Sequence, residues 1–132
     1  MIDPQALGLP HREPFVFVDE IHAHTPGESA AGRKTFPAET PFFRGHFPGD
    51  PIVPGVILAE ALAQVAGIAA GQAGMRLAAI KAMKFPSAAQ PGEEIALSAR
   101  KVGAVGGLWQ FAVEARIGER VVAEGVIVLA AA

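Results

Sequence analysis

The sequence predicts a single α+β domain in which an antiparallel sheet wraps around one long buried helix. Residues 54–71 form an apolar segment of helical length, and such a helix is normally enclosed by the rest of its domain. The segments before and after it alternate apolar and polar residues, or form short apolar runs between turn residues, which is typical of strands. The chain has 132 residues, 51% of them hydrophobic, which suffices for the core of one domain over residues 1–132.

Two strands are predicted before the helix. Phe15–Val18 is a short apolar run and predicts the first strand. Pro26-Gly27 marks a turn, after which Ser29–Phe36 is expected to return antiparallel to the first strand. The segment Pro37–Pro54 contains five prolines, which predicts a loop that is rigid in places.

The helix is expected to begin near Pro54 and to end between Gly71 and Gly74. Proline suits a first helical turn because the amide hydrogen that it lacks would be unpaired there, and glycine permits a left-handed cap at the end. Glu60 and Gln64 are four residues apart within the helix, so they share one face as a narrow polar stripe.

Four strands are predicted after the helix. The clearest is Trp109–Ile117, where apolar and polar residues alternate as in a half-buried strand. Gly118-Glu119 predicts a two-residue hairpin loop, with glycine at the position that needs a positive φ. The other predicted strands are Ala78–Phe85, Ile95–Arg100 and Val121–Leu129, and the other predicted turns are Pro91-Gly92 and Gly103–Gly107.

Composition argues against several classes of function. A net charge of −2 gives no support for nucleic-acid binding or for a polybasic membrane anchor. The absence of cysteine excludes disulfides, thiol nucleophiles and thiolate metal sites, and it fits a cytoplasmic protein. Met1–Pro10 lacks the features of a signal peptide. Ile52–Ala70 approaches membrane-spanning length, but its proline and polar residues favour a core helix.

His46 is the first candidate catalytic residue. It is flanked by glycines and prolines, residue types that fix a backbone path and let another group approach closely. Histidine is the side chain best suited to move a proton near neutral pH, which indicates general acid–base catalysis. The alternative interpretation is an ordinary histidine in a surface loop.

Glu60 is the second candidate, because a carboxylate inside an apolar helix is costly to bury. It can donate a proton or bind a substrate hydroxyl, or it can simply reach solvent or an ion-pair partner at the helix edge. Gln64 can orient Glu60 or a water, or it can be a core amide bonded to backbone. The helix start at Gly55-Val56 offers unpaired amides to a developing negative charge, or it is an ordinary helix start.

The remaining histidines, His11, His22 and His24, give weaker signals. They lack a metal-ligand pattern with carboxylates, so they are interpreted as structural or surface residues. The sequence also contains no glycine-rich phosphate loop, no zinc-ligand spacing and no serine-nucleophile motif.

Several motifs together resemble the (3R)-3-hydroxyacyl-[acyl-carrier-protein] dehydratases of FabZ type, over nearly the whole chain. The spacing between His46 and Glu60 also agrees with that family. The motifs are LPHREPFVFVD at residues 9–19, FFRGHFPGDPIVPGV at residues 42–56, LAEALAQ at residues 58–64, Lys84-Phe85 and Pro91-Gly92.

The resemblance implies a hotdog fold, in which a curled antiparallel sheet wraps a long helix, and homodimers that are often assembled into trimers of dimers. It implies that His46 abstracts the α-proton of a 3-hydroxyacyl thioester on acyl carrier protein, while Glu60 of the other subunit assists departure of the hydroxyl as water. Amides around Gly55 would hold the thioester carbonyl, and the product would be a trans-2-enoyl thioester. No metal or redox cofactor is needed. Related bifunctional dehydratase/isomerases tend to carry Asp where Glu60 stands, which favours dehydration without isomerisation.

Two of the departures from the family pattern concern aromatic residues. Glu13 replaces an aromatic residue that is common at its position, and the chain contains no tyrosine, which leaves Phe85 as the candidate gate. Two alternative functions stay open. One is a hotdog acyl thioesterase, whose carboxylate directs water at the thioester carbonyl, and the other is a non-catalytic acyl-binding subunit.

Overall fold

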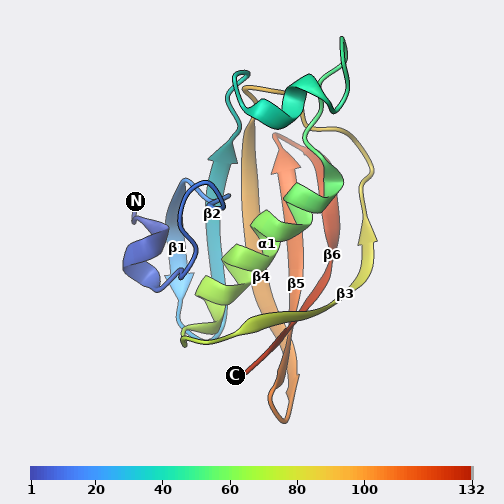
Figure 1. Cartoon of the computed structure of the whole chain (residues 1–132). Helices are drawn as coiled ribbons and strands as arrows, with labels where there is room; N and C mark the ends of the chain where they lie inside the picture. The colour runs from blue at the N-terminus through green and yellow to red at the C-terminus, as the bar shows by residue number, and fades with distance from the viewer. Residues whose placement is uncertain (132) are drawn as a thin grey trace.

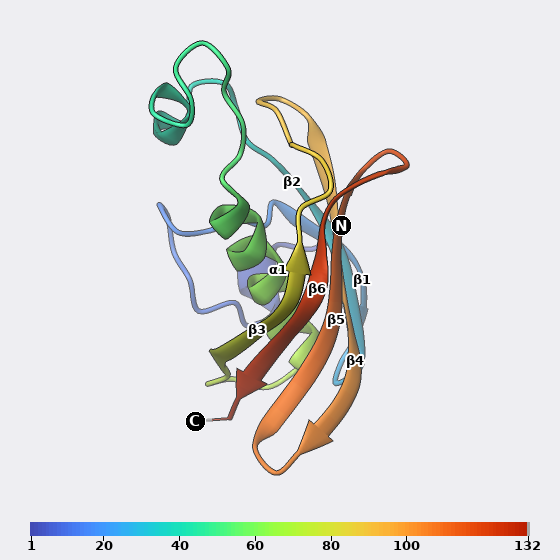
Figure 2. The same cartoon turned by 90° about the vertical axis from the view of Figure 1, so that its right-hand side faces the viewer.

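The computed structural model describes residues 1–131, in which six strands form one antiparallel sheet and one long helix covers a face of it (Figures 1 and 2). The strand order is β1-β2-β4-β5-β6-β3, so β1 and β3 form the two edges. The predicted α+β architecture is therefore confirmed. The elements are η1 Pro4–Leu7, β1 Glu20–Thr25, β2 Ser29–Thr35, η2 Pro41–Arg44, α1 Gly55–Ala70, β3 Arg76–Lys84, β4 Glu94–Val105, β5 Leu108–Ile117 and β6 Arg120–Ala130.

The hydrophobic core lies between α1 and the sheet. Leu62 and Val65 of α1 are fully buried, as are Phe111 of β5 and Ile127 of β6. Burying a side chain of this size contributes about 1.5–3 kcal/mol. The predicted apolar helix thus forms the centre of the domain.

The C-terminal end of α1 is capped by the turn between β1 and β2. The amide of Gly27 donates to the carbonyl of Ala69 at 2.9 Å, and Nε2 of His24 lies 2.9 Å from the carbonyl oxygen of Ile68. Gly71 ends the helix with φ of +70°, and a Cβ there would lie 2.9 Å from the Gly27 nitrogen, so the position requires glycine. His24 therefore has a structural role, as its sequence context indicates.

The prediction of a strand at Phe15–Val18 is wrong, because this segment runs outside the sheet and the first strand is β1. Backbone groups of Phe15 and Phe17 instead bond to the side chain of Gln64 on α1. Phe17 and Val18 are buried in the core. The run is apolar because it packs into the core beside the helix, and one glutamine bonds two of its backbone groups in place of a neighbouring strand.

The other predicted strands and the helix are confirmed, with shifts at their ends. β4 continues to Val105, so the predicted turn at Gly103–Gly107 reduces to Gly106-Gly107. The register shifts between Lys101 and Gly103, which indicates that Gly103 lies in an irregularity of the strand pair rather than in the turn. The resulting β4–β5 hairpin extends beyond the rest of the domain (Figure 1).

No helix within residues 1–131 is long and apolar enough to cross a membrane.

Candidate active site

Glu60 lies on the face of α1 that the sheet leaves uncovered, with 20% of its side chain exposed. It lines a cavity of about 460 Å³ between the N-terminal segment, α1 and the start of β3. We call this the Glu60 cavity. It is lined by Gly8–His11, Glu60, Ala63, Gln64, Gly67, Gln72–Leu77 and Leu129.

Gln64 fixes Glu60 from one helical turn away. Its side chain is 1% exposed, and its Nε2 donates to Oε2 of Glu60 at 3.1 Å and to the carbonyl of Phe15 at 3.0 Å. Its Oε1 accepts from the amide of Phe17 at 2.9 Å. Gln64 is therefore both a core amide and an orienting group. Both N–H groups of Gln64 are engaged in these two bonds. We therefore expect Gln64 to affect a substrate by positioning Glu60.

His11 is a residue of this site that the sequence interpretation missed. Its Nε2 lies 3.5 Å from Oε2 of Glu60, and its Nδ1 is buried without a hydrogen-bond partner within residues 1–131. The guanidinium of Arg12 donates to the carbonyls of Leu9 and His11, which holds the loop in place. The sequence signal available for His11 was its position in the proline-containing segment just before Phe15. In the structure, the carbonyl of Phe15 accepts a hydrogen bond from Gln64.

His46 lies in the loop between η2 and α1. Figure 1 shows this loop at the end of the domain where α1 begins. The amide of His46 donates to the carbonyl of Phe42 at 3.0 Å, and its carbonyl accepts from the amide of Ile52 at 2.9 Å. Its Nδ1 lies 3.2 Å from the carbonyl oxygen of Ile52, and its ring stacks on Phe47. A carbonyl only accepts, so the bond places the hydrogen on Nδ1 and leaves Nε2 with a lone pair that can take a proton.

One chain alone does not bring the two candidate catalytic residues into the same cavity. The residues that line the Glu60 cavity come from the N-terminal segment, α1, the start of β3 and β6, and His46 is not among them. The part of the site that carries His46 is thus separate from the part that carries Glu60.

The start of α1 packs against Phe85, the residue after β3. A Cβ added to Gly55 would lie 3.2 Å from the Phe85 ring, so glycine lets the ring approach the helix start closely. The amides of Ile57 and Leu58 bond to the carbonyl of Pro54. The first amides of a helix have no partner within the helix, which leaves those of Gly55 and Val56 available to a ligand. The Val56 side chain is 77% exposed beside them.

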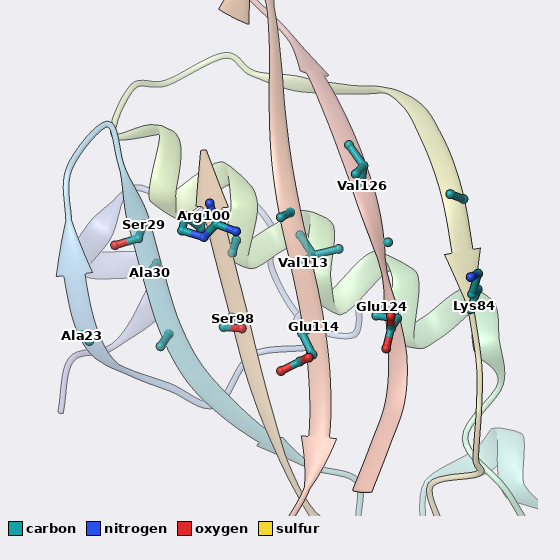
Figure 3. Close-up of a pocket in the computed structure, with 15 residues that line it drawn as sticks. Ala23, Ser29, Ala30, Lys84, Ser98, Arg100, Val113, Glu114, Glu124 and Val126 are labelled. Atoms are coloured by element: carbon teal, nitrogen blue, oxygen red, sulfur yellow. The ribbon is translucent and has the colours of Figure 1, made fainter. Parts of the chain in front are cut away.

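A second hollow lies over the outer face of the sheet, away from α1 (Figure 3). It measures about 680 Å³ and is lined mostly by small or apolar residues, together with the charged residues Lys84, Arg100, Glu114 and Glu124. None of the predicted site residues lines it, so it is not a candidate for the chemistry of His46 and Glu60. Within residues 1–131 there is also no cluster of three or more His, Asp or Glu side chains that could hold a metal ion.

Comparison with known proteins gives consistent results. A family model described as ApeI-like, for the ApeI dehydratase, matches residues 22–126. The 3-hydroxyacyl-[acyl-carrier-protein] dehydratase FabZ of Geobacter metallireducens is 42% identical over 115 residues, which cover 81% of this chain and 77% of that protein. The enzyme of the same name from Ruminiclostridium cellulolyticum is also 42% identical, over 126 residues that cover 90% of this chain and 88% of that protein.

Among solved structures, the dehydratase heterocomplex ApeI:P from Xenorhabdus doucetiae matches with a TM-score of 0.83 and 16% sequence identity. The match covers 100% of this chain and 92% of that chain. The predicted hotdog fold is thereby confirmed.

Proposed function

This chain belongs to the ApeI-like dehydratase family, alongside the FabZ-type dehydratases, and we propose that it converts a (3R)-3-hydroxyacyl thioester on acyl carrier protein into the trans-2-enoyl thioester and water. Such a step belongs to fatty-acid or related acyl-chain synthesis. The observation that carries the proposal is the Glu60 carboxylate, which stands in a cavity with one oxygen held by Gln64. The other oxygen is left for the substrate hydroxyl.

Each predicted site residue has a role in this elimination. Nε2 of His46 accepts the proton from C2 of the substrate, and the carbonyl oxygen gains negative charge. Amides of Gly55 and Val56 at the start of α1 stabilise that charge. The electron pair then forms the C2–C3 double bond as the C3–O bond breaks. The Glu60 carboxyl group enters this step carrying a proton and gives it to the hydroxyl, which leaves as water. Transfer of the proton from His46 back to Glu60 completes the cycle.

The site is completed, in this proposal, by a second copy of the chain. β3 is an edge of the sheet, and all of its residues except Met83 are exposed, including Leu77 and Ile80. An uncovered edge strand that exposes apolar side chains is a template for pairing with another chain. Pairing of β3 with its copy about a two-fold axis would cover this edge and bring the partner's loop toward the Glu60 cavity. Sedimentation would distinguish a dimer from the trimer of dimers that the family resemblance implies.

Phe85 is proposed as the gate of this shared site. Its side chain is 47% exposed and its ring rests on Gly55, at the end of α1 where the thioester carbonyl would bind. A rotation of the ring would open or close access to that end of the helix.

The decisive experiment is incubation of the protein with 3-hydroxybutyryl and 3-hydroxydodecanoyl thioesters, each on acyl carrier protein and on coenzyme A. Formation of the enoyl thioester, followed by its absorbance and by mass spectrometry, is the expected result. Release of free thiol without enoyl product would instead identify a thioesterase. Binding without any chemical change would identify a non-catalytic acyl-binding subunit, and either of these results would overturn the proposal.

A further inference from the structure

We propose that Gly67 sets the length of the acyl chain that this site accepts, because a long chain would lie in the Glu60 cavity along α1. The inference rests on the proposed function and names a specificity determinant for it. Gly67 is two helical turns beyond Glu60, and both residues line the same cavity.

The chemical groups on the uncovered face of α1 change from the N-terminus of the helix to its C-terminus. Val56, Glu60, Ala63 and Gly67 are spaced four, three and four residues apart, which places them on one side of the helix. The first offers a backbone amide, the second a carboxylate, and the last two are small. If the thioester carbonyl lies at the helix start and the C3 hydroxyl at Glu60, the carbons beyond C3 continue toward Gly67.

The cavity beside Gly67 is open. A Cβ added to Gly67 would meet no heavy atom within 4 Å, counted apart from the helix's own nearby backbone. Gly67 lies seven positions after Glu60, which corresponds to about 10 Å along the axis at the usual rise of an α-helix. A glycine inside a helix is destabilising relative to alanine, so its presence here is explained by the space that it leaves.

The walls of this part of the cavity suit an alkyl chain. Leu9 lies on the side of the N-terminal segment, Met75 directly precedes β3, Leu77 is the second residue of β3, and Leu129 comes from β6. Of the polar lining residues, His11 and Gln64 contact Glu60, at the end where the hydroxyl would react. Gln72 and Arg76 also line the cavity, in the turn after α1 and at the first residue of β3. Leucine and methionine side chains therefore line the cavity that the carbon chain would enter, and the polar side chains of Gln72 and Arg76 lie on the side of the α1–β3 connection.

The test compares wild type with Gly67→Ala and Gly67→Leu, using 3-hydroxybutyryl and 3-hydroxydodecanoyl thioesters. In Gly67→Leu we expect kcat/KM for the long substrate to fall about 10- to 100-fold relative to that for the short one, because a branched side chain fills the space. Gly67→Ala should show a smaller shift in the same ratio. Light scattering on the same samples reports whether the oligomeric state is preserved.

Two results would overturn the inference. One is an unchanged ratio of the two kcat/KM values in Gly67→Leu. The other is an equal loss on both substrates together with dissociation, which would mean that Gly67 serves contact between copies of the chain. Failure of the proposed function looks different, since wild type would then dehydrate neither substrate.

A binding measurement keeps the inference testable in that case. Calorimetry with saturated butyryl and dodecanoyl pantetheine thioesters, which have no hydroxyl to lose, should show that wild type prefers the long chain. Gly67→Leu should remove that preference. A preference that persists in Gly67→Leu would contradict the role of Gly67 whether or not the protein is a dehydratase.

Discussion

The loop that carries His46 and the helix that carries Glu60 are held in place in different ways. The loop is held largely by its own backbone, through bonds between Phe47 and Asp50 and between His46 and Ile52, with one anchor from Val53 to Ala89. Glu60 lies on a helix in the core, and Gln64 of the same helix binds its carboxylate. His11 contacts Glu60, and Phe17 bonds to Gln64, although both residues are distant from the helix in sequence. The Glu60 part of the site is thus assembled by the fold of one chain. The His46 loop is a locally held unit, which in our proposal meets the Glu60 cavity of a second copy.

The largest expected effect comes from the loop. His46→Ala should lower kcat by about 10²–10⁴-fold, which is the usual contribution of a general acid–base group. The melting temperature should stay unchanged, because the contacts of the ring lie within its own loop. His22→Ala, an exposed histidine on β1, is the matched control and should keep full activity. A His46→Ala enzyme within threefold of wild type would remove His46 from the mechanism.

The next effect tests whether the two parts of the site meet through β3. Ile80→Lys places a charge at an exposed apolar position of this edge strand. We expect the variant to dissociate into monomers, and we expect its activity to fall in proportion to the fraction of monomer. Val105→Lys adds the same charge at the 75% exposed tip of the β4–β5 hairpin and should leave the dimer intact. Light scattering measures the oligomeric state of each variant, and an activity assay measures its turnover. An active monomer of Ile80→Lys would contradict a site shared across this edge.

Gln64→Leu should damage the Glu60 part of the site in two ways. It leaves the amide of Phe17 buried without its acceptor, which costs about 1–3 kcal/mol in the free energy of unfolding. It also releases the Glu60 carboxylate, so kcat should fall even at temperatures where the variant is folded. Denaturant unfolding and kinetics on the same sample separate the two effects. Unchanged stability would mean that the Phe15–Val18 segment is held by other contacts.

The smallest effect is expected at His11. We expect His11→Ala to lower kcat by about 10-fold or less, because a 3.5 Å contact steadies Glu60 without reacting itself. His11→Gln can present an N–H to the same carboxylate and should recover part of the loss. Equal rates for the Ala and Gln variants, both below wild type, would point to packing of the ring as its role.

The sequence predicted most of this fold because its signals are local. The alternation at Trp109–Ile117, the glycine of Gly118-Glu119 and the proline before α1 act within a few residues, and each marks an element that the structure contains. Phe15–Val18 was misread because a short apolar run looks the same in a strand and in a segment packed into the core. Its true partner, Gln64, is 47 residues away from Phe17. The strand order likewise depends on contacts that no local pattern records.

The candidate site could be predicted only in part, because only some of its residues have local sequence signals. His46 and Glu60 stood out because their neighbours are unusual for their residue types. His11 did not, because its importance comes from a contact with Glu60 across the fold. The separation of His46 from the Glu60 cavity could be anticipated only through the family resemblance, since no residue pattern within one chain encodes it.

The central claim is that each site takes His46 from one chain and Glu60 from another, and subunit mixing tests it most directly. His46→Ala and Glu60→Gln homodimers should each be inactive. After unfolding and refolding together, half of the subunits should be in mixed dimers with one intact site each, so roughly a quarter of wild-type activity should return. Native mass spectrometry would verify that mixed dimers have formed. Mixed dimers without activity would place both residues in the site of a single chain and contradict the account.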